Sequence, residues 1–148
     1  MVNDNIKITG DVKIDIIGAD GAVKDTREIK NLVVTSGKTF IASRMVGVGS
    51  NVMGWMELGT GTTAAAAGDT ALQTAIGGSR VALSSGTSAA NVVTYVASFP
   101  AGTGTGAVTE AGVFNASSAG TMLCRTVFSV VNKGAADAMS ITWTITVS

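Results

Sequence analysis

The sequence predicts a mainly β protein, an antiparallel β-sandwich or jelly-roll-like barrel with one short α-helix at about residues 37–47. Segments in which apolar and polar residues alternate recur along the chain, separated by turns rich in Gly and Ser, as is typical of antiparallel strands. The apolar residues are mostly small or β-branched, which suits closely packed sheets better than long helices. Only one segment has helical spacing, whereas a parallel α/β fold needs a helix between most strands.

Residues 1–35 are expected to form a charged β-hairpin region, and residues 36–148 a sandwich body within the same domain. In the first strand, Val12, Ile14 and Ile16 alternate with polar residues, so one face is apolar and the other is wet. The pair Asp20-Gly21 predicts the turn, and the chain then returns as a second, more polar strand.

The helix is expected to begin just after this hairpin, where Phe40, Ile41 and Met45 recur at helical spacing. Ser36 is the expected N-cap, because its hydroxyl can accept hydrogen bonds from the free amides of the first turn. The helix should end near Gly47 and pack its three apolar side chains against a sheet.

Six further strands are expected in the body, which gives about eight in all. They cover residues 53–58, 80–84, 91–99, 106–114, 121–131 and 139–148. The last alternates most regularly, with Ile141, Trp143 and Ile145 on one face. Between strands, Asp69 is expected to cap a short helical turn, and Gly102 to Gly106 to form a flexible hairpin tip.

Charge is concentrated at the N-terminus, although ten Lys and Arg balance ten Asp and Glu. Eleven charged residues lie between residues 1 and 30: Asp4, Lys7, Asp11, Lys13, Asp15, Asp20, Lys24, Asp25, Arg27, Glu28 and Lys30. A soluble domain usually has a surface about a quarter to a third charged, so we expect neighbouring subunits to cover part of the body. The balance favours neither nucleic acid nor membrane as a partner. Without a signal peptide or membrane span, a soluble, cytoplasmic product is expected.

The residue types also argue against an enzyme. The chain has no His, and so lacks the usual general base and the commonest zinc ligand. Glu57 and Glu110 have no spacing that indicates a glycosidase pair; an ion pair of Glu110 with Arg80 or Arg125 on an adjacent strand is expected instead. We predict no catalytic residue, no cofactor and no metal site.

Four other features are expected to be structural. Cys124 lies in an apolar strand, where a buried thiol is expected. Gly37-Lys38-Thr39 matches the end of a phosphate-binding loop, but the glycine required upstream is replaced by Leu32. The tips Gly59-Thr-Gly61 and Gly102-Thr-Gly104 lack the spacing of a dinucleotide fingerprint.

The order of several stretches resembles small virion structural proteins of tailed bacteriophages. These stretches are Asn31-Leu-Val-Val34 with Ser36-Gly37-Lys38, Leu58-Gly-Thr-Gly-Thr-Thr63, Gly68-Asp-Thr-Ala-Leu72, Thr109-Glu-Ala-Gly-Val-Phe-Asn115, Gly120 to Phe128, Asn132-Lys-Gly134 and Ile141-Thr-Trp-Thr-Ile-Thr146. The resemblance covers nearly all of the chain from Asn31 on. Such proteins include capsid decoration (cement) proteins and segments of tail-fibre proteins.

The resemblance implies a structural protein that is made in the host cytoplasm and ends in the virion. As a cement protein it would self-associate, as a dimer or trimer, and bridge major capsid subunits. The alternative is a tail-fibre or tail-appendage protein that binds other tail proteins and presents loops such as residues 102–106 to a host surface. In the cement role the self-interface is expected among the apolar strands and the helix, and the charged hairpin would contact the shell or neighbours. The candidate interface residues are Phe40, Met45, Trp55, Tyr95 and Trp143.

Overall fold

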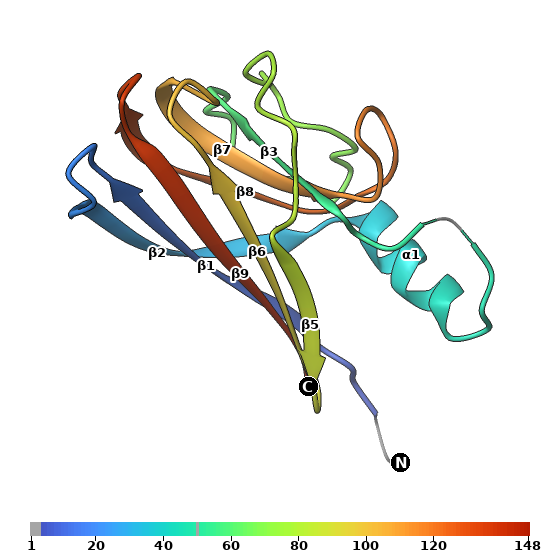
Figure 1. Ribbon diagram of the computed structural model, residues 1–148. Helices are drawn as coiled ribbons and strands as arrows, with labels where there is room; N and C mark the ends of the chain where they lie inside the picture. Colours follow the sequence, from blue (N-terminus) through green and yellow to red (C-terminus); the bar gives the residue numbers. More distant parts are fainter. Residues whose placement is uncertain (1–3, 50) are drawn as a thin grey trace.

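The computed structural model describes residues 4–49 and 51–148, which form one curled antiparallel sheet with a single helix beside it (Figure 1). The elements in chain order are β1 (Ile8–Ile17), β2 (Val23–Val33), α1 (Thr35–Arg44), β3 (Trp55–Gly59), β4 (Val81–Ala82), β5 (Ser85–Ala89), β6 (Val92–Phe99), β7 (Gly106–Phe114), β8 (Met122–Lys133) and β9 (Ala138–Val147). The strand order is β4-β3-β7-β8-β2-β1-β9-β6-β5. The prediction of a mainly β fold with one short helix is therefore confirmed.

The sheet bends at two places, so that its inner faces enclose one core. On one side, Leu32 and Val33 at the end of β2 pair with β8, which connects the layer of β1, β9, β6 and β5 to the layer of β3 and β7. On the other side, β4 leads into β5: Leu83 donates to the carbonyl of Gly54 (2.9 Å) and Ser84 to that of Val96 (2.7 Å). The curl is visible in Figure 1.

Strand β9 supplies the centre of the core, as its alternation predicts. Trp143 is fully buried and lies in register with Val12 on β1 and Tyr95 on β6, so that three strands contribute to one row of side chains. Burial of each such large apolar side chain stabilises the fold by roughly 1.5–3 kcal/mol. This regular inward alternation explains why β9 is predictable from sequence.

The predicted N-terminal hairpin is confirmed. Gly18 donates to the carbonyl of Ala22 and Gly21 to that of Gly18, both at 2.9 Å, and the positive φ of 81° at Gly21 favours glycine there. Val12, Ile14 and Ile16 are buried while Asp11 and Lys13 are exposed. Along its whole length β1 also pairs with β9, so the hairpin is part of the main sheet.

The start of the helix differs from the prediction. Val34 occupies the N-cap position without a side-chain cap bond, and Ser36 instead donates from its hydroxyl to the carbonyl of Met122 (3.0 Å). The helix begins earlier than predicted, directly after β2. Gly37 is buried against β8, where a Cβ would overlap the carbonyl of Leu123, so this glycine permits close packing of helix and sheet.

The end of the helix also differs. It stops at Arg44 rather than near residue 47. Phe40 and Ile41 pack against the core as expected, but Met45 lies beyond the last turn and its relative exposure is 83%. The expectation that Met45 packs against a sheet was wrong: the helix is buried near its start, at Gly37, and its C-terminal end, where Met45 is the C-cap residue, stays exposed.

Three expectations about the loops and minor strands were wrong. Residues 69–72 form no helix, because Asp69 is engaged in a turn with Ala66. Residues 102–106 are not a hairpin tip, since β6 pairs with β9 whereas β7 pairs with β8, and the connection crosses between the layers. Strand β5 was not expected, and of the strand expected at residues 80–84 only Val81–Ala82 is formed.

Candidate functional site

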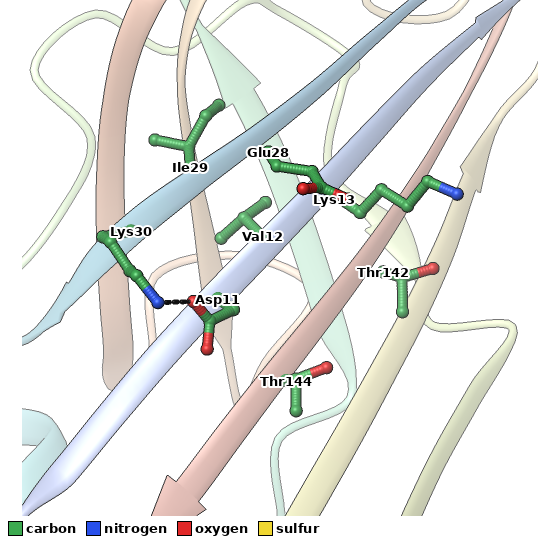
Figure 2. A pocket seen from close by; sticks show the side chains of 8 residues that line it. All are labelled: Asp11, Val12, Lys13, Glu28, Ile29, Lys30, Thr142 and Thr144. Carbon is green, nitrogen blue, oxygen red and sulfur yellow. Dashed lines mark hydrogen bonds and ion pairs between the residues drawn. The ribbon is translucent and has the colours of Figure 1, made fainter.

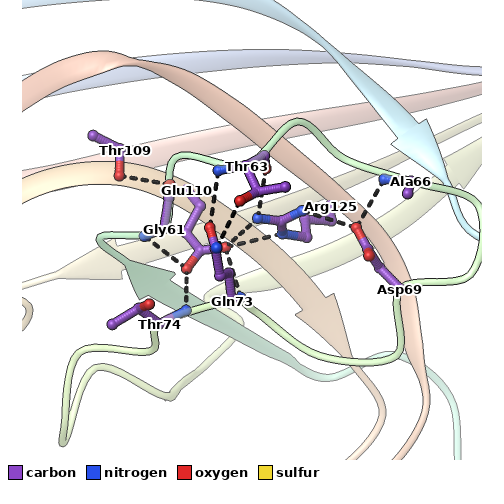
Figure 3. A network of polar contacts seen from close by, with 9 residues as sticks. All are labelled: Gly61, Thr63, Ala66, Asp69, Gln73, Thr74, Thr109, Glu110 and Arg125. Carbon is purple, nitrogen blue, oxygen red and sulfur yellow. Dashed lines mark hydrogen bonds and ion pairs between the residues drawn. The ribbon is translucent and has the colours of Figure 1, made fainter.

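The most heavily hydrogen-bonded group of side chains centres on Glu110 and Arg125, on adjacent strands β7 and β8 (Figure 3). Glu110 is fully buried and Arg125 is 2% exposed. Their closest approach is 2.8 Å, between Nη2 and Oε2, and Nε donates to the same oxygen at 2.9 Å. The predicted ion pair of Glu110 with Arg125 is confirmed.

The remaining bonds of Glu110 go to the long connection between β3 and β4. Its Oε1 accepts from the amides of Gly61 (3.0 Å) and Thr74 (2.7 Å), and its Oε2 accepts from the amide of Gln73 (3.0 Å). The glycine at position 61 is needed here, because a Cβ would lie 2.5 Å from Oε1. The motif Gly59-Thr-Gly61 thus wraps a carboxylate and is not a flexible tip.

Arg125 fastens the same connection at two more points. Its Nη1 donates to Oδ2 of Asp69 (2.8 Å) and its Nη2 to the carbonyl of Thr63 (3.0 Å). Burial tends to raise the pKa of Glu110, but its three backbone hydrogen bonds and Arg125 outweigh this and hold it below the usual value. The pKa of Asp69 is also lowered, by the amide of Ala66 and by Arg125, against the effect of burial. Both carboxylates are therefore held ionised and fully engaged by the protein itself.

The other glutamate of the body, Glu57, forms an ion pair with Arg80. Arg80 donates to it at 2.8 Å, and the guanidinium lies over the ring of Phe114 at 3.6 Å from the centroid. Glu57 and Glu110 are thus each paired with a separate arginine.

A second polar cluster closes the end of β8. Lys133 is almost completely buried, and its Nζ donates to the carbonyls of Pro100 (2.9 Å) and Asp137 (2.6 Å). Burial lowers the pKa of Lys133, and Asp137 partly opposes this. The carboxylate of Asp137 accepts from Lys24 at 3.0 Å. This cluster ties the connections at one end of the barrel together.

The charged outer face of β1, β2 and β9 forms a shallow groove (Figure 2). Across the strands, Asp11 lies opposite Lys30 and Lys13 opposite Glu28, and an ion pair joins Asp11 to Lys30. Thr142 and Thr144 continue these two rows on β9. Because opposite charges alternate, the face is locally neutral and carries no patch of one sign.

A second groove lies where β5 and β6 face the helix, and its lining combines apolar side chains with small polar ones and one arginine. It is lined by Phe40, Arg44, Val52, Met53, Gly86, Thr87, Ser88, Val93 and Tyr95. Burial raises the pKa of Tyr95 to about 12, so its hydroxyl is neutral at physiological pH. Beside this groove the segment that follows the helix exposes Met45, Val46, Val48 and Val52, each more than 60% accessible.

The structure brings some of the five candidate interface residues together. Phe40 and Tyr95 line the second groove, and Met45 lies exposed just after α1. Trp55 is half-buried against a small apolar cluster, and Trp143 is enclosed in the core. Sequence reasoning missed the exposed valines after the helix. The run Met45-Val-Gly-Val48 was a usable signal, because it places consecutive residues without a polar side chain at the expected end of the helix.

The remaining predicted sites are structural in the part of the chain that is described. Cys124 is buried, as predicted, and burial raises the pKa of its thiol. Lys38 and Thr39 lie within α1, not in a loop. Within residues 4–49 and 51–148, no group of three Cys, Asp or Glu side chains is placed to hold a metal ion. The one described helix is too short to cross a membrane.

Comparison with known proteins identifies no relative: no family model matches the chain, and no curated protein or solved structure is significantly similar to it.

Proposed function

We propose that this chain is a bacteriophage virion structural protein, a capsid decoration or cement protein that self-associates and bridges major capsid subunits. One observation carries the proposal: the buried charges are engaged within the protein, while one end exposes a largely apolar surface beside Arg44. Such a surface is typical of a protein that packs against neighbours. The choice of a phage virion protein, among proteins that pack against neighbours, rests on the order of motifs that resembles such proteins.

The mechanism is additive binding energy. A stable protein interface buries about 1,200–2,000 Å², and many copies that bind only the assembled shell stabilise it by mass action. The rigid sheet suits this role, because the Glu110–Arg125 network fastens its longest connection and leaves little to be ordered on binding. No chemical step is needed, and we propose none.

A tail-fibre or tail-appendage role is the alternative. It would use residues 102–106 as a loop for a host surface. This connection is anchored at its start, since Gly102 donates to the carbonyl of Ala135 (3.0 Å) and Lys133 donates to the carbonyl of Pro100. Gly104 is buried, where a Cβ would lie 2.6 Å from Leu58. A clamped connection is less suited to variable surface recognition than a free loop, which favours the cement role.

Co-sedimentation tests the proposal. The purified chain is mixed with expanded shells assembled from the major capsid protein of the same phage, and bound protein is measured after centrifugation. We expect saturable binding at a fixed ratio to the capsid subunit, and greater resistance of the shells to heat. A chain that stays in the supernatant but binds host cells would overturn the cement role and favour the tail alternative.

A further inference from the structure

Strand β5 ends the sheet with one edge unpaired. It pairs with β6 on one side, and in the described part of the chain no strand pairs with its other side. All five residues, Ser85–Ala89, are exposed. Proteins usually protect such an edge with a charge, a proline or a bulge. Here the edge has none of these, and no charged residue occurs between Arg80 and Glu110.

Several exposed apolar side chains lie at the same end of the molecule, in the segment after α1 and at Val147. Val52 and the central residues of β5 line one groove together with Phe40 and Arg44. The turn after β5 contacts the end of β9, where Asn91 donates to the carbonyl of Val147 at 2.8 Å, and Val147 is itself exposed. Figure 1 shows the tip of β5 beside the C-terminus, with α1 across from it. An open edge and an apolar patch thus form one surface.

We propose that this surface binds a second copy of the chain, with β5 of each copy paired antiparallel across a two-fold axis. The inference rests on the self-association in the proposed function and gives it a location. In a two-fold interface the same surface patch meets itself, so a charge close to the axis would meet its like. Strand β5 itself carries no charge and satisfies this condition, and the charged residue of the adjacent groove, Arg44, belongs to α1 and not to the paired edge. The free backbone groups of both edges become paired, and the layer β2-β1-β9-β6-β5 continues into its copy.

Cysteine cross-linking tests the register of the pairing. Thr87 is the central residue of β5 and would lie close to its counterpart at the axis. Native Cys124 is buried and does not interfere. Under mild oxidation we expect Thr87→Cys to form a disulfide-linked dimer in high yield. The matched control, Ser129→Cys, is exposed on β8 and should stay monomeric on a denaturing gel.

A charge placed on the edge tests the same surface without a cross-link. In sedimentation velocity we expect Thr87→Lys to shift the dimer to monomer, with at least a tenfold weaker association, because two lysines then meet at the axis. Ser98→Lys, exposed on β6 but away from the edge, should remain dimeric. Circular dichroism confirms that both variants fold.

The possible outcomes of these experiments test the β5 interface and the proposed binding to shells separately. A dimer that survives Thr87→Lys and gives no Thr87→Cys cross-link, or a wild-type trimer, would overturn the β5 interface while self-association stands. A wild-type monomer that still saturates shells would overturn the interface and leave shell binding intact. A monomer that binds no shells would overturn both.

Discussion

At the scale of single residues, Glu110 and Arg125 determine how the body holds its longest loop. Removal of one partner from a buried ion pair leaves an uncompensated charge, which typically costs about 3–5 kcal/mol. We therefore expect Glu110→Gln and Arg125→Met each to lower the free energy of unfolding by about that amount, measured by urea denaturation. The control Glu28→Gln alters an exposed residue of β2 and should change it by less than about 1 kcal/mol. Equal effects for all three variants would contradict the role of the buried pair.

The same carboxylates predict a loss of stability in acid. The folded-state pKa values of Glu110, Asp69 and Asp137 lie below their unfolded values, so their contribution is complete above the unfolded values and is lost as pH falls through the folded ones. Burial raises the pKa of Glu110, but the hydrogen bonds to its carboxylate outweigh this and keep the pKa low. Melting temperatures should therefore be level near neutral pH and fall below about pH 4.5. Glu110→Gln should show a smaller fall between pH 5 and pH 3 than wild type; an identical fall would contradict the assignment.

Gly37 provides a residue-scale test of the contact between helix and sheet. Alanine normally stabilises a helix relative to glycine, but here its Cβ would overlap the carbonyl of Leu123. We expect Gly37→Ala to destabilise the protein by about 1–3 kcal/mol. Lys38→Ala, at an exposed position of the same helix, should be nearly neutral in the same thermal melt. A stabilising Gly37→Ala would show that the helix stands away from β8.

At the scale of elements, the connection from residue 60 to residue 76 should open as a unit when its anchor is removed. The amides of Gly61, Gln73 and Thr74 all donate to Glu110. Hydrogen bonds to a charged group contribute about 1.5–3 kcal/mol, so these amides should exchange with solvent at least about tenfold faster in Glu110→Gln. Amides in β1 serve as the internal reference. Unchanged exchange in the connection would mean that other contacts hold it.

Elements with regular inward alternation were predictable from sequence, and those set by distant contacts were not. Strands β1 and β9 were predicted because their buried residues recur at every second position. Strand β5 was not, since its small polar residues show no alternation and it is placed by pairing with β6 alone. The helix start depends on Gly37 against β8, a long-range contact that local capping rules do not include. In the polar site, the ion pair of Glu110 was predictable from charge. The loop amides that donate hydrogen bonds to its carboxylate were not predictable.

At the scale of the whole molecule, the uneven distribution of charge separates two surfaces. The charged residues of the first hairpin lie largely on the outer face of β1 and β2, in rows of alternating sign. At the end formed by β5, the segment after α1 and the C-terminus, exposed apolar side chains outnumber the charged ones, which include Arg44 and Lys7. The first surface is self-neutralised and solvated, and the second is the one suited to neighbours. This division is the physical basis of the proposed assembly role.

The most direct test of that role is the copy number and position of the chain in the purified virion. Quantitative mass spectrometry gives its ratio to the major capsid protein, and cryo-electron microscopy locates its density. The cement role predicts a fixed ratio to the capsid subunit, and density that fits this curled β-sheet bound between capsid subunits over the whole shell. A few copies confined to the tail, or absence of the chain from the virion, would contradict it.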